Sequence, residues 1–154
     1  MRRFFVLALI ACLTAGAFAL PAVAKKKKPI KFSTEGAFQI GNPADYMADA
    51  GLVRNEFEQT CAIPVSHGTD GFVIELPAAV QKVDLDASLE GQDATGGPDM
   101  DMYFYDEGCL STGEVATTDL SEYGIVPAGT KWVVVSAWIG ADVTFTLDLV
   151  EKKG

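Results

Sequence analysis

Short runs in which apolar and polar residues alternate constrain this chain more than any other feature. In Lys82–Leu89, Asp101–Tyr105 and Val143–Val150, every second residue is apolar. A period of two places alternate side chains on opposite faces of a strand, so each run predicts a β-strand with one buried face. Glycine and proline turns separate these runs, and no segment keeps a 3.6-residue period over a full helix length. The pattern predicts an all-β fold, an antiparallel β-sandwich or jelly roll of about eight strands.

The other segments are assigned by the same reasoning. Further strands are expected at Glu35–Ile40, Gly71–Pro77 and, as a central strand that is apolar on both faces, Lys131–Trp138. Leu52–Ile63 is expected to be a strand as well, although its period is irregular. The Ser- and Thr-rich Leu110–Tyr123 is expected to hold one edge strand, and Glu90–Pro98 a glycine-rich loop. Pro43–Gly51 fits either one helical turn or a structured loop.

The N-terminus has the three parts of a secretory signal peptide, which we assign to residues 1–24. Arg2 and Arg3 supply its positive charge, and Phe4–Leu13 is an apolar segment too short to span a bilayer. Ala22–Ala24 has the small residues of a cleavage site, and Ala17–Ala19 offers a second one. The sequence therefore predicts an exported protein, secreted or periplasmic, with no stable membrane span.

A lipid anchor is the lesser alternative for the same segment. Leu9–Cys12 fits a lipoprotein-type cleavage box, which would leave the protein anchored through Cys12. Cleavage there would leave only about eight apolar residues before the cysteine, near the lower limit for a signal segment. Residues 25–32 are expected to form a basic linker, and residues 33–154 the β-sandwich domain.

Two cysteines, Cys61 and Cys109, remain once the signal peptide is removed. An even pair in an exported protein predicts a disulfide. It would close a loop of about 49 residues and stabilise the fold by roughly 4 kcal/mol on the chain-entropy model.

Acidic residues dominate the domain. From Ser33 onward, five basic residues stand against all 21 acidic ones, a net charge of −16. Such a domain repels phosphate backbones, which argues against nucleic-acid binding. The lysine run at Lys25–Lys28 and Lys31 is typical of a solvated tail that can touch an anionic surface. A purely disordered spacer is the favoured alternative.

The order of motifs over about 80 of the 154 residues resembles the bacterial pre-peptidase C-terminal domain family. The stretches that carry the resemblance are Asp70–Pro77, Val83–Gly97, Asp99–Asp106, Pro127–Val135 and Thr144–Val150. Collagen-binding domains of secreted bacterial collagenases are similar. The resemblance implies a small, non-catalytic β-sandwich, and some members bind calcium through the D-x-D pair, matched here by Asp99 and Asp101. The Cys61–Cys109 pair is not part of the family pattern.

Asp99, Asp101 and Asp93 are the candidate calcium ligands. Asp99 and Asp101 are two residues apart at the start of a strand and therefore share one face. Asp93 and backbone carbonyls of the preceding glycine-rich loop would add to the six to eight oxygens that calcium requires. The alternative is that these acids form a solvated edge that deters strand aggregation.

Four aromatic residues are candidates for a ligand surface: Tyr103, Tyr105, Trp132 and Trp138. Exposed, they would stack on sugar rings or peptide, whereas buried they would be core between two sheets. His67 is the only histidine and lies in a polar stretch, which argues against a Ser-His-Asp site and a histidine-rich zinc site.

We therefore expect a secreted, non-enzymatic module that binds an extracellular protein or polysaccharide, in a calcium-dependent manner. A metal-free carbohydrate-binding or structural envelope domain is the alternative. A small hydrolase is the least favoured, because the domain has little room for a catalytic cleft.

Overall fold

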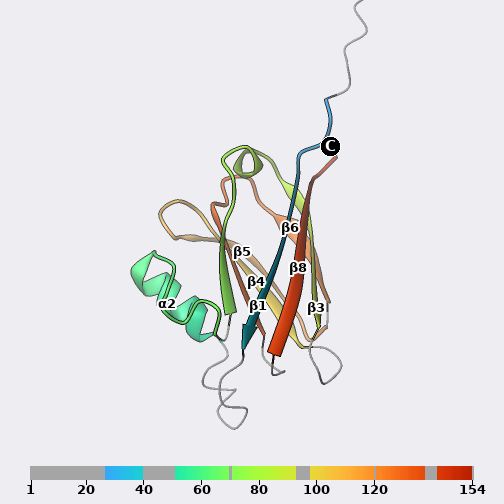
Figure 1. Ribbon diagram of the computed structural model, residues 1–154. Helices are drawn as coiled ribbons and strands as arrows, with labels where there is room; N and C mark the ends of the chain where they lie inside the picture. Colours follow the sequence, from blue (N-terminus) through green and yellow to red (C-terminus); the bar gives the residue numbers. More distant parts are fainter. Residues whose placement is uncertain are drawn as a thin grey trace, which may run out of the picture.

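The computed structural model describes residues 27–39, 51–69, 71–92, 98–119, 121–137 and 142–153. Two four-stranded antiparallel sheets pack face to face (Figure 1). The first sheet has the order β1 (Lys31–Gln39), β8 (Asp142–Glu151), β3 (Leu85–Gln92) and β6 (Ser121–Val126). The second has the order β2 (Gly71–Glu75), β7 (Trp132–Ala137), β4 (Met100–Tyr105) and β5 (Ser111–Ala116). The predicted eight-stranded antiparallel β-sandwich is confirmed.

The main core lies between the sheets and is built from the apolar positions of the alternating runs. Leu85, Ala87 and Leu89 of β3 are buried there, while Asp86 between them is exposed. Strand β8 follows the same rule, with its apolar residues inside and its polar residues outside. The expected central strand is β7, which pairs with β2 on one side and with β4 on the other.

Leu52–Ile63 is not a strand, and this prediction is wrong. The chain forms the helix α2 (Leu52–Thr60), and Val53 and Phe57 are fully buried. These two residues are four apart, so on a helix they share one face. That face packs on the outer surface of the second sheet, where it contacts Val73, Tyr103, Tyr105 and Val134. The apolar surface of the sheet explains why so short a segment is helical, since tertiary packing supplies most of a short helix's stability.

The segment Leu110–Tyr123, expected to hold one edge strand, holds all of one edge strand and the beginning of a second. Strand β5 is at the edge of the second sheet and β6 at the edge of the first. Gly124 of β6 lies so close to Val115 of β5 that a Cβ at position 124 would collide with that side chain.

Strand β1 begins at Lys31, within the segment expected to be a linker. A short 3₁₀ helix, η1 (Val80–Lys82), precedes β3.

The predicted Cys61–Cys109 disulfide is present. It joins the C-terminal end of α2 to the turn that follows β4, with 5.6 Å between the two Cα atoms. The ring of Phe57 packs beside Tyr105 and Trp132, with ring centroids 5.1 and 5.7 Å apart. The disulfide and this aromatic group together hold α2 against the sheet.

The expected signal peptide, including Cys12, lies outside the described residues. Within the described part of the chain, no helix is long and apolar enough to cross a membrane.

Candidate metal centre

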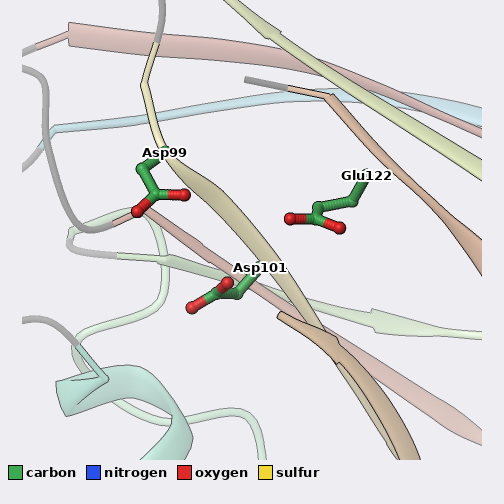
Figure 2. Close-up of side chains that lie close together, drawn as sticks. All are labelled: Asp99, Asp101 and Glu122. Atoms are coloured by element: carbon green, nitrogen blue, oxygen red, sulfur yellow. The ribbon is translucent and has the colours of Figure 1, made fainter. Parts of the chain in front are cut away.

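Three carboxylates meet where β4 and β6 begin. Asp99 directly precedes β4, Asp101 is its second residue, and Glu122 is the second residue of β6 in the other sheet. Each supplies a carboxylate oxygen that lies within 4.8 Å of the other two (Figure 2). The sandwich therefore brings together acids that are up to 23 positions apart in the sequence.

Two of these side chains are almost completely buried. Asp101 is 2% exposed and Glu122 is 1% exposed. The Tyr103 hydroxyl donates a hydrogen bond to Asp101 Oδ2 over 2.8 Å. Glu122 Oε1 accepts hydrogen bonds from the backbone N–H of Thr117, at 2.9 Å, and from its hydroxyl, at 2.7 Å. These bonds fix the orientation of both carboxylates.

Asp99 is the least satisfied of the three. Its Oδ1 is buried and has no hydrogen-bond partner among the described residues. Burial, followed by the negative charges of Glu122 and Asp119, raises the pKa of the Asp99 carboxyl above its usual range. No described Lys, Arg or His nitrogen lies within 4.0 Å of an Asp99 or Glu122 carboxylate oxygen. At Asp99, burial beside other negative charges favours the uptake of a proton or a cation.

The arrangement suits a hard cation with oxygen ligands. Carboxylates are typical ligands of calcium and magnesium, whereas zinc sites usually include cysteine or histidine. A groove of about 280 Å³ opens beside Asp99 and Asp101 and is also lined by Tyr103 and by residues 116–118. It leaves room for water molecules to complete the coordination of an ion.

Sequence reasoning found two of the three acids. Asp99 and Asp101 are close together, as expected, while Asp93 lies outside the described residues. Glu122 was missed. Its signal is an acidic residue at an inward-facing position of β6, two residues before Gly124 and four before the buried Val126. That signal becomes readable only once the limits of β6 are known.

The proposed aromatic ligand surface is not supported by the positions of the tyrosines. Tyr103 and Tyr105 are 5% and 1% exposed because α2 covers them. They are core, as in the alternative interpretation, but between helix and sheet. Arg54 of α2 lies over the Tyr103 ring, 3.9 Å from its centroid. Trp132 is half-buried against Phe57, and Trp138 lies outside the described residues.

His67 occupies a structural position. Its Nδ1 accepts a hydrogen bond from the backbone N–H of Val73 over 3.0 Å, and its ring packs on Phe72 with 4.0 Å between centroids. Burial lowers the pKa of the imidazole. The neutral ring is therefore the form that fits this contact.

Comparisons with known proteins leave the family open. No protein-family model and no curated protein matches this sequence. Among solved structures, the crystal structure of SPBc2 prophage-derived protein YomS matches 81% of this chain and 100% of its own, with 14% identity and a TM-score of 0.37. A likeness of this strength carries no argument about function.

Proposed function

We propose that this protein is an exported, non-catalytic β-sandwich module that binds calcium and, with calcium bound, an extracellular protein or polysaccharide. One observation carries the proposal: the buried Asp101 and Glu122 converge with Asp99, whose buried Oδ1 lacks a hydrogen-bond partner among the described residues. A divalent cation would neutralise this charge and give that oxygen a ligand.

Calcium fits better than magnesium. Calcium accepts irregular coordination by six to eight oxygens, whereas magnesium demands near-ideal octahedral geometry. Asp101 and Glu122 come from different sheets and are held by hydrogen bonds to Tyr103 and Thr117, which limits how far these two carboxylates can move to complete an octahedron. The resemblance to the pre-peptidase C-terminal domain family, in which some members use the D-x-D pair, points to the same ion.

Export is supported by the disulfide. Disulfides persist in oxidising compartments and are rare in the cytosol, so the Cys61–Cys109 bond is compatible with a secreted or periplasmic protein. The absence of catalysis is supported by the position of His67, whose Nδ1 is taken up by a backbone hydrogen bond.

Thermal melting with calcium and with chelator tests the metal site. At a calcium concentration 100 times the Kd, binding would stabilise the fold by about 2.7 kcal/mol, which raises Tm by on the order of 10 °C. Glu122→Gln should abolish the shift, because glutamine keeps an acceptor for Thr117 but loses the charge. Glu90→Gln removes an equal charge from an exposed position and is the matched control. Identical wild-type Tm values in calcium and chelator would contradict the proposal.

A metal-free carbohydrate-binding or structural envelope domain is the second candidate, and a groove on the first sheet favours it. This groove, of about 560 Å³, is lined by polar residues that can bond sugar hydroxyls, including Glu90, Gln92 and Thr144. Retention on a polysaccharide column in chelator, lost in Gln92→Ala, would favour this candidate over the calcium-dependent one.

A further inference from the structure

Six exposed lysines gather at one end of the sandwich. Strand β1 begins where β8 ends, since Lys31 pairs with Val150, and β3 also begins there, since Leu85 pairs with Glu151. Figure 1 shows the described N-terminal residues and the C-terminus at the same end of the molecule. We call the lysines of this region the basic end: Lys27, Lys28, Lys31, Lys82, Lys152 and Lys153.

The lysines of the basic end are unpaired, unlike the other described cations. Arg54 pairs with Glu58 and Glu114, and Lys131 pairs with Glu75 and Glu107. Within the described ranges, no carboxylate oxygen lies within 4.0 Å of an amino group of the basic end. These six charges are therefore available to an external partner.

Three carboxylates of the first sheet lie at this end. Asp86 pairs with Val150, which also pairs with Lys31, and its side chain is exposed. The other two are already used by the fold. Asp84 Oδ1 accepts a hydrogen bond from the backbone N–H of Ala128, and Glu151 Oε2 accepts one from Ile30, each over 2.8 Å. Six positive and three negative side chains leave this end of the first sheet with a net charge of +3 in a domain that is otherwise strongly acidic. Lys25 and Lys26 precede Lys27 in the sequence and extend the same run.

The acidic cluster lies too far away to cancel this charge. Glu122 pairs with Leu89, which pairs with Leu147, four residues along β8 from Glu151. At about 3.4 Å per residue this is roughly 14 Å, more than the Debye length of about 8 Å at physiological ionic strength. The basic end therefore presents its own positive field.

We propose that the basic end docks the protein on the surface of a membrane that contains anionic phospholipid. Lysines act as point charges, whereas arginine is preferred where one phosphate is bound in fixed geometry, and the described part of this end has no arginine. Exposed lysines at strand ends suit the diffuse charge of a lipid surface, where each contributes to binding. With this end on the membrane, the strands point away from it and the Asp99–Glu122 cluster faces outward.

A nucleic acid is the competing partner, and charge argues against it. A flat membrane contacts only the end of the sandwich, so the acidic remainder of the domain stays away from the anionic surface. A nucleic acid is long and would also approach the sides of a domain whose net charge is −16, where it would be repelled. The expected export also brings the protein to membranes and not to nucleic acids.

Vesicle co-sedimentation tests the proposal. The protein is produced by export, its N-terminus is identified by mass spectrometry, and it is mixed with neutral phosphatidylcholine vesicles or vesicles containing about a third phosphatidylglycerol. We expect the protein to bind the anionic vesicles and not the neutral ones, even with chelator present. Binding should be lost as the salt concentration rises from about 50 to 300 mM, because salt screens the attraction. Lys152→Gln with Lys153→Gln should weaken partition on the order of 25-fold, at about fivefold per lysine.

The matched control lowers the net charge by the same amount, two units, at the other end of the strands. Gln39→Glu with Gln92→Glu alters two exposed residues at the ends of β1 and β3 and should leave vesicle binding unchanged. Equal losses in both double variants would show that net charge alone matters and overturn the proposal. So would failure of the wild type to bind anionic vesicles, equal binding to neutral vesicles, or lysine-dependent binding to duplex DNA in place of vesicles. Vesicle binding that requires calcium would assign the contact to the acidic cluster and would overturn it too.

Discussion

Replacing Phe57 by alanine tests whether α2 belongs to the cooperative unit of the sandwich. Phe57 is 0% exposed and packs against Tyr105 and Trp132. Truncation of a buried phenylalanine to alanine usually costs about 3–5 kcal/mol, from lost apolar transfer and from the cavity left behind. The aromatic contacts on two sides place this site in the middle or upper part of that range, so we expect a loss of about 4 kcal/mol.

Urea unfolding measures this loss. With an m value of about 2 kcal/mol/M, the midpoint should fall by about 2 M, and tryptophan fluorescence should follow the same transition as circular dichroism because Trp132 touches Phe57. Gln59→Ala, at an exposed position of the same helix, should change the free energy of unfolding by less than about 0.5 kcal/mol. A Phe57→Ala protein within about 1 kcal/mol of the wild type would refute the reasoning and make α2 a detachable appendage.

Two further predictions concern the connections of α2 and of the 61–69 loop. Replacing Cys61 and Cys109 by serine should lower the free energy of unfolding by about 4 kcal/mol, since it releases a cross-link across 48 positions, and an unchanged urea midpoint would contradict this. The lowered pKa of His67 means that the unfolded chain binds a proton more readily than the folded one. The contribution of neutral His67 to the free energy of unfolding should therefore be fully present above pH 6.5. It should be lost as the pH drops from there toward the folded-state pKa. The measurement is the difference between the urea midpoints at pH 7.5 and pH 5. His67→Asn keeps an acceptor for the Val73 N–H, and it should remove the part of this difference that comes from His67. An unaltered difference would assign the pH dependence to another group.

Local patterns predicted most of the sandwich. Leu85, Ala87 and Leu89 must face one way on any strand, because the period of two is a property of the extended backbone itself. The same logic correctly predicted β8 and the inward Met102 and Phe104 of β4. The disulfide followed from an even cysteine count together with an expected export signal.

The helix shows where local patterns fail. Val53 and Phe57 have helical spacing, but nine residues are too few for a period to separate helix from strand. The helical structure of this segment is decided by the apolar outer face of β4 and β7. Tyr103 and Tyr105 on that face are buried when a helix packs against them. For the same reason the tyrosines are buried and not available as a ligand surface.

The sequence by itself determined the strand periodicity, the disulfide pair and the acidic D-x-D at the start of β4, because each depends on neighbouring residues or on composition. The tertiary structure alone decided that Glu122 joins Asp99 and Asp101, and that Lys82 and Lys152 lie at the end where β1 begins. These groupings depend on strand order and register, which are set by pairing between residues far apart in the chain. Local alternation determines which face a side chain takes, but not which strand lies beside it.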